Sequence, residues 1–185
     1  MYKRQTHSGA HIRDGIDLKR TMFLVIVAMI PCLLFGMWNI GHQYHLSLGA
    51  SSDLIANVMV GAWKVIPLIV VSYGVGLGIE FLFAGMRGHS INEGYLVSGM
   101  LIPLIMPVDV PLWMVALAVA FAVVVAKEVF GGTGMNILNV ALTARAFLFF
   151  AYPKQLSGEI WIHDVATSKA GGMLVDGYTG ATALG

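Results

Sequence analysis

Residues 21–40 read TMFLVIVAMIPCLLFGMWNI, twenty consecutive positions without a charged side chain. A helix of this length extends about 30 Å, because each residue adds about 1.5 Å, and this matches the hydrocarbon core of a bilayer. The stretch therefore predicts a membrane-spanning helix. Pro31 is expected to kink it, and Trp38 fits the interfacial zone at its far end.

The composition of the whole chain indicates the same class. Hydrophobic residues make up 57% of the 185 residues, charged residues 11%, and the mean hydropathy is +0.78, which is too apolar for an ordinary soluble domain. Basic residues do not cluster among aromatic ones, so nucleic acid is not an expected partner. The single cysteine, Cys32, has no disulfide partner, and we expect it to be a small buried residue.

Further apolar stretches predict more spans. A polar linker is expected at 41–64, ending at Lys64. The turn before the span at 111–129 contains Asp109, a candidate helix cap, and Pro111, a residue suited to the start of a helix. The predicted fold is an all-α transmembrane bundle of about five spans within residues 21–152. A polar segment, 1–20, precedes the bundle and a tail, 153–185, follows it. The four later spans are expected at residues 65–86, 94–106, 111–129 and 136–152.

The distribution of basic residues predicts the orientation. Five crossings would place the two ends of the chain on opposite sides of the membrane. The side of the N-terminus carries more lysine and arginine, so the positive-inside rule predicts a cytoplasmic N-terminus and an extracytoplasmic tail. The residues on that side are Lys3, Arg4, Arg13, Lys19, Arg20, Arg87 and Lys127, against Lys64, Lys154 and Lys169 on the other.

Lys127 and Glu128 lie at the end of the fourth predicted span, and two further charged residues fall deeper within predicted spans. Glu80 lies a few residues before Arg87, and a carboxylate at that depth is costly unless it is paired or hydrated. It is therefore either part of an ion pathway or an interfacial residue that reaches water. Arg145 lies near the middle of the fifth predicted span and needs a partner, which is either Glu80 or an anionic cofactor group.

Glycines and amides mark two further candidate sites. Gly74, Gly76 and Gly78 in the second span permit close approach of a neighbouring backbone or a flat ligand. The Gly-rich break at 131–134 is expected to line a cofactor pocket, and it lacks the lysine of a nucleotide-triphosphate loop. Asn136 and Asn139 are three residues apart, so both amides are expected on one helix face, as cofactor contacts or as helix packing contacts.

The chain ends in DGYTGATALG, residues 176–185. Glycines beside hydroxyls let the backbone approach a bulky group and leave N–H donors for anionic oxygens, although such a segment alone is typical of a flexible loop. Three upstream blocks accompany it: INEG at 91–94, KEVFGGTG at 127–134 and RAFLFFAYP at 145–153. Together these stretches resemble the B subunit of the sodium-translocating NADH:quinone reductase, and also the related D subunit of the Rnf electron-transport complex.

The resemblance, which runs from about Asp14 to the last residue, implies cofactors. In that family the second threonine of the terminal motif is esterified to the phosphate of FMN, which implies Thr182 here, with Asp176 and Gly180 in the same motif. The family also implies a noncovalent riboflavin, for which Asn136, Asn139 and Arg145 are the candidate contacts. Val140 stands where the family usually has proline, so the family pattern does not predict the local backbone conformation here.

The resemblance also implies a function: an electron-carrier subunit in the bacterial inner membrane that passes electrons through riboflavin toward quinone, coupled to export of Na⁺. Its partners would be the other subunits, quinone, Na⁺ and a flavin transferase that attaches the FMN. The family's subunit is longer at both ends, so this chain is expected to be a fragment. Two alternatives stay open: the Rnf subunit, and a secondary transporter without flavin, whose broken helices would carry intramembrane charges.

Overall fold

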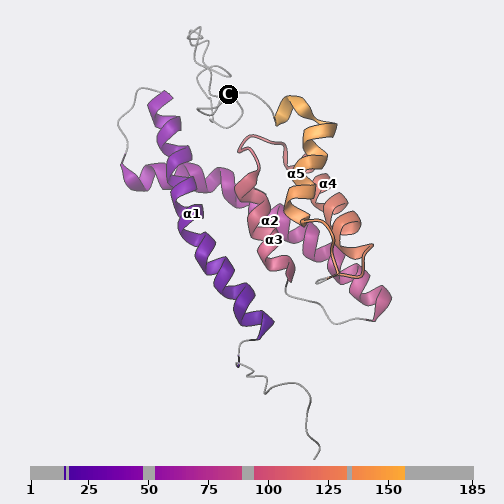
Figure 1. Cartoon of the computed structure of the whole chain (residues 1–185). Helices are drawn as coiled ribbons and strands as arrows, with labels where there is room; N and C mark the ends of the chain where they lie inside the picture. Colours follow the sequence, from indigo (N-terminus) through magenta and orange to yellow (C-terminus); the bar gives the residue numbers. More distant parts are fainter. Residues whose placement is uncertain (1–14, 16, 48–52, 89–93, 133–134, 157–185) are drawn as a thin grey trace, which may run out of the picture.

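The computed structural model describes residues 15, 17–47, 53–88, 94–132 and 135–156, and these form helices without any strand (Figure 1). The all-α prediction is confirmed for this part of the chain. The helices in order are α1 (Leu18–Ser47), α2 (Leu54–Arg87), α3 (Gly94–Ile105), α4 (Leu112–Ala122), the π-helical turn η1 (Val123–Glu128), α5 (Val140–Ala151) and the short 3-10 helix η2 (Pro153–Gln155).

The first two helices are longer than the sequence predicts. α1 has 30 residues and α2 has 34, and both are long and apolar enough to cross a membrane. The predicted linker at 41–64 is wrong, because most of it is helical. Polar side chains support the extra turns: the Trp38 ring stacks on His42 at a centroid distance of 5.1 Å, and His45 Nδ1 lies 2.7 Å from Asn57 Oδ1 on α2.

The later helices are shorter, although they lie where spans were predicted. α3 and α5 have 12 residues each, which corresponds to about 18 Å and is below the thickness of a bilayer core. α4 continues directly into η1, so this helical segment covers residues 112–128. Of the described helices, α1 and α2 alone have the length to cross by themselves, and the five crossings stay a prediction.

Close contacts show that α1, α2 and α3 alternate in direction. A Cβ at Gly41 would overlap the backbone of Asn57, and a Cβ at Gly61 would overlap that of Met37, so α1 and α2 cross antiparallel with touching backbones. The hydroxyl of Ser72 on α2 donates to the carbonyl of Gly99 on α3 at 2.9 Å. The Tyr73 hydroxyl donates to the carbonyl of Leu96, and Gly76 lies against Tyr95, so later residues of α2 meet earlier residues of α3 and this pair is antiparallel as well.

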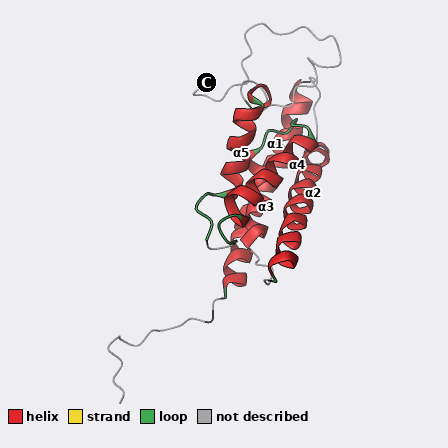
Figure 2. Cartoon of the chain, turned by 90° about the vertical axis from the view of Figure 1, so that its right-hand side faces the viewer, coloured by secondary structure: helices red, strands yellow, loops and turns green. Residues whose placement is uncertain are grey.

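The alternation continues through α4 and α5. Trp113 near the start of α4 packs edge-on against Tyr152 just after α5, and Phe121 further along α4 stacks on Phe147 of α5. α4 and α5 are therefore antiparallel. Figure 2 shows the helices running side by side in one bundle.

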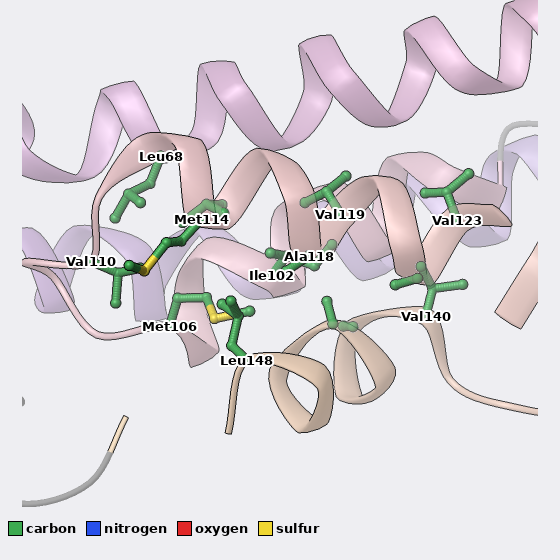
Figure 3. Close-up of a cluster of buried hydrophobic side chains, with 14 of the residues drawn as sticks. Leu68, Ile102, Met106, Val110, Met114, Ala118, Val119, Val123, Val140 and Leu148 are labelled. Carbon is green, nitrogen blue, oxygen red and sulfur yellow. The ribbon is translucent and has the colours of Figure 1, made fainter. Parts of the chain in front are cut away.

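The apolar core lies among α2, α3, α4 and α5. α4 and η1 contribute buried pairs at every fourth residue, so one face of this segment is fully enclosed. α1 leans against α2 and α3 from outside this cluster. Figure 3 shows Leu68, Ile102, Met106, Val110, Met114, Ala118, Val119, Val123, Val140 and Leu148 in the cluster.

The outer surface of α2 is more apolar than its buried face. The buried residues recur every third or fourth position and include Asn57, Gly61, Ser72, Gly76 and Glu80. Large apolar side chains occupy the exposed positions, which is the reverse of a soluble helix and is typical of a helix that faces lipid. Examples are Ile55, Met59, Trp63, Val70, Phe81 and Leu82. Cys32 of α1 is likewise exposed, so the expectation that it is buried is wrong.

Candidate functional site

The charged residues of α2 and η1 meet inside the bundle. The Lys127 ammonium donates a hydrogen bond to Glu80 Oε1, and the two side chains are only 6% and 5% exposed. Withdrawing either charge from water alone would be costly, so each stabilises the other. The interfacial alternative for Glu80 is therefore wrong, and its cation is Lys127 instead of the Arg145 that the sequence suggested.

The π-helical turn η1 brings Lys127 to this position. The N–H of Val129 donates to the carbonyl of Val124, five residues earlier, at 3.0 Å. This wider turn directs more consecutive residues to one side than an α-helix does. Ala126, Lys127 and Glu128 are all buried as a result. The sequence predicts the end of the span here but contains no signal for a π turn.

Tyr95 of α3 forms one wall of the ion pair. Its ring centroid lies 5.7 Å from Lys127 Nζ, within the range of a cation–π interaction. Its hydroxyl donates to the carbonyl of Ser72 at 2.9 Å, which fixes the ring against α2. Ring and backbone come this close because position 76 is glycine, where a Cβ would overlap the ring. The prediction of close packing is confirmed for Gly76.

The neighbouring glycines do not share that role. Gly74 and Gly78 are exposed, and a Cβ at either would meet no atom within 4 Å. The three glycines alternate along the chain, and successive positions two apart cannot all face one side of a helix. Within the described part of the chain no group packs against these two residues, and close approach of another backbone or a flat ligand there stays a prediction.

A second ion pair joins the opposite end of α2 to the turn before α4. Lys64 Nζ lies 3.0 Å from Asp109 Oδ1, and the two side chains are 35% and 41% exposed. Pro111 occupies the N-cap position of α4 and makes no cap hydrogen bond through its side chain, and the capping role of Asp109 stays a prediction. The two pairs lie about 24 Å apart along α2, at about 1.5 Å per residue, and show that α2 and α4 are parallel.

The two asparagines do not share a helix face. α5 begins at Val140, and Asn139 is its N-cap: Asn139 Oδ1 accepts from the N–H groups of Ala141 and Leu142 at 3.0 and 3.2 Å. Asn136 lies in the preceding loop, exposed, and its Nδ2 donates to the carbonyl of Leu138 at 3.3 Å. The prediction of one helix face is wrong, because an Asn-cap starts the helix after both residues.

Val140 is the first residue of α5 and is 3% exposed. Proline is favoured at this position because its missing N–H is not needed in the first turn. Valine occupies this position, and α5 begins there. The departure from the family pattern is thus compatible with the local backbone.

The remaining candidate residues are not part of the two ion pairs described above. Arg145 lies in the middle of α5 and is half-buried. Gly131 and Gly132 follow η1 with φ values of 111° and 96°, and the N–H of Gly132 donates to the carbonyl of Lys127 at 3.0 Å. Thr182, Asp176 and Gly180 lie outside the described residues, and their roles stay predictions.

A helical bundle with an apolar exterior, small residues at its helix crossings and charges paired in its interior is typical of an integral membrane protein. Comparison with known proteins specifies the family. Residues 5–185 match the NQR2, RnfD, RnfE family, and the chain belongs to this family.

Several similar proteins are named as the B subunit of the Na⁺-translocating NADH-quinone reductase. The chain is 45% identical over 203 residues to the protein of this name from Stutzerimonas stutzeri, with 97% of the chain and 48% of the relative aligned. The proteins from Chromohalobacter salexigens and Pseudomonas aeruginosa are 45% and 43% identical, with 97% of the chain aligned to 46% and 48% of the relatives. The chain thus spans about half the length of these relatives.

Proposed function

We propose that this chain forms part of the B subunit of a sodium-translocating NADH:quinone reductase in a bacterial inner membrane. The observation that carries the proposal is its identity of 45% to a subunit of that name along 97% of its length. The apolar exterior of α2 supports a membrane location. The other subunits, quinone and Na⁺ are the partners that this assignment implies.

The family description also includes the Rnf subunits, so the D subunit of an Rnf complex is the nearest alternative. The relatives described above favour the quinone reductase, because all of them are named as its B subunit.

FMN is the proposed covalent cofactor, held through its phosphate by the Thr182 hydroxyl within the motif that contains Asp176 and Gly180. A separate flavin transferase would form this ester. When bound, the flavin supplies one- and two-electron chemistry that no protein side chain offers. The chain's own contribution is to present the threonine in a glycine-rich segment that a bulky group can approach.

Riboflavin is the proposed second cofactor. Its contacts would come from the loop before α5 and the start of that helix, because the two asparagines do not share a helix face. Asn139 Oδ1 is engaged by the helix N-terminus, whereas Asn136 is exposed in the loop. Contacts to a flavin would therefore come from the loop 135–139, with Arg145 one to two turns further along α5. The role of these residues is to orient the ring, and electrons would pass from it toward quinone.

Glu80 is the proposed residue of the sodium pathway. It is a carboxylate in a long apolar helix, and oxygen ligands of this kind suit a hard monovalent cation. Its burial among protein groups keeps it from the lipid, as a residue on an ion path requires.

The test is in-gel fluorescence of the denatured polypeptide, co-expressed with a flavin transferase, under ultraviolet light. We expect a fluorescent band for the wild type and for Thr179→Val, the matched control at the nearest hydroxyl, and a dark band for Thr182→Val. A dark wild-type band, with the transferase active on a known substrate, would overturn the flavin assignment and favour a flavin-free transporter.

A further inference from the structure

The Glu80 carboxylate that we assign to the sodium pathway is already occupied by a cation of the chain itself. The Lys127 ammonium bonds Glu80 Oε1 and lies over the Tyr95 ring, and both charged side chains are buried. A mobile cation can therefore take this position at Oε1 only if the ammonium moves away.

The surroundings of Lys127 allow such a movement. Lys127 is the fifth of the six residues of η1, and the helix ends directly after it. The next residues are at the surface, with Val129 63% and Phe130 39% exposed. A lysine has four flexible carbons and commonly extends along a helix end to place its ammonium in water. A rotation of the Lys127 side chain from Glu80 toward the end of the bundle would therefore not require η1 to unfold.

Charge balance at Glu80 can be kept with either cation. Glu128 is also buried, and its negative charge acts on Glu80 in the opposite sense to the positive charge of Lys127. When a monovalent cation replaces the ammonium at Glu80, the buried carboxylate remains neutralised. When the cation leaves, the ammonium returns, and an unpaired buried carboxylate is avoided at each stage.

We propose that Lys127 is a tethered counter-ion that competes with the transported cation for Glu80 and so sets the apparent affinity of the site. This rests on the proposed role of Glu80 in the sodium pathway. A site that is available for only a fraction of the time binds its ligand with an affinity reduced by that fraction. Removing the competitor should therefore raise the apparent affinity for the cation, whereas a purely structural lysine would have no such effect.

The experiment measures thermal unfolding of the purified membrane complex that contains this chain, titrated with sodium chloride against choline chloride at constant ionic strength. For Lys127→Met we expect low stability without sodium, recovery with sodium, and half-maximal recovery at a sodium concentration at least tenfold below that of the wild type. Lys127→Arg should titrate as the wild type does. Lys64→Met, which removes the exposed lysine of the other ion pair, is the matched control and should also leave the titration unchanged.

The outcomes distinguish the competition by Lys127 from the role of Glu80 in the sodium pathway, on which it rests. If Glu80→Gln abolishes the sodium response while Lys127→Met titrates like the wild type, Lys127 is a fixed structural partner and the competition is overturned. If Glu80→Gln leaves the sodium response intact, the role of Glu80 itself is wrong.

A second measurement needs no variant, in case Lys127→Met does not fold. Amine acetylation of the wild-type complex, read by mass spectrometry, should leave Lys127 unreacted in choline and label it when sodium saturates the site. Equal labelling of Lys127 in both salts would overturn the proposal.

Discussion

Single side chains decide where the helices of this protein start and how closely they approach. Asn139 shows this clearly, because one amide oxygen satisfies two N–H groups at the start of α5. Two asparagines three residues apart predict a shared helix face, whereas the tertiary arrangement uses one of them as a cap. Asparagine is favoured at N-caps and disfavoured inside helices, so the sequence does contain a signal for the cap, which the interpretation of residues 136–152 as one helix did not use.

We predict that Asn139→Ala destabilises the protein by about 1 kcal/mol, since substitution of an N-cap asparagine by alanine typically has this effect. Asn139→Asp should retain most of the stability because its carboxylate can accept the same bonds. Asn136→Ala is the matched control and should change the midpoint of thermal unfolding in detergent very little. Equal losses for both alanine variants would contradict the capping role.

The same two variants also bear on the riboflavin assignment. Noncovalent flavin released on denaturation should fall for both if the loop 135–139 contacts the ring. A loss of stability without a loss of flavin in Asn139→Ala would restrict that residue to capping.

At the scale of the elements, α2 determines most of the packing. Its buried face includes small and polar residues as well as Val65 and Leu68, and α1, α3, α4 and η1 all contact α2. The interaction with α3 uses hydrogen bonds from Ser72, Tyr73 and Tyr95 to backbone carbonyls, at 2.9, 2.6 and 2.9 Å. Such bonds contribute more specificity than apolar contacts between helices, because lipid offers apolar contacts equally well.

We predict that Gly76→Ala destabilises the contact of α2 with α3, because the added Cβ would overlap the Tyr95 ring. Overpacking of this kind typically costs about 1–3 kcal/mol. Gly78→Ala is the matched control: it lies on the exposed side of the same helix, where alanine is about 1 kcal/mol better than glycine in helix propensity. Thermal unfolding should move in opposite directions for the two variants, and a shift of equal sign would contradict the assigned packing.

The π turn η1 is the other element that determines the site. It ends a segment that is otherwise an apolar α-helix, and it brings Lys127 under Tyr95 and against Glu80. The residues VVVAKE are equally compatible with an α-helix. Local propensity therefore does not distinguish the two geometries, and packing against α2 decides between them.

At the scale of the whole molecule, the alternating helix directions place two groups of residues at opposite ends of the bundle. One end carries the Lys64–Asp109 pair, and the other carries Glu80 and Lys127. α1 runs antiparallel to α2, so its last turns lie beside Asn57, near the start of α2. This arrangement agrees with chain crossings in alternate directions, as the sequence predicted.

We predict that Leu46 and Met86 lie on opposite sides of the membrane, with Leu46 outside. Both are exposed, at 64% and 82%, so each can be replaced by cysteine in a Cys32→Ser background. A membrane-impermeant maleimide added to intact cells should label Leu46→Cys and leave Met86→Cys unlabelled until the cells are opened. Labelling of both from outside would show that α2 does not cross, and exchange of the two results would reverse the proposed orientation.

Hydropathy and short motifs in the sequence were enough to establish the helical class, the approximate positions of the apolar helices and the family. These properties are local in the chain, so no folded structure is needed to recognise them. Which charges meet was decided by the folded arrangement instead. Glu80 and Lys127 are 47 positions apart, and Arg145 was an equally good partner by composition. Only the parallel packing of α2 with α4, together with the wider turn of η1, brings one of the two cations to the carboxylate, because buried charges pair by proximity in space and not by spacing along the chain.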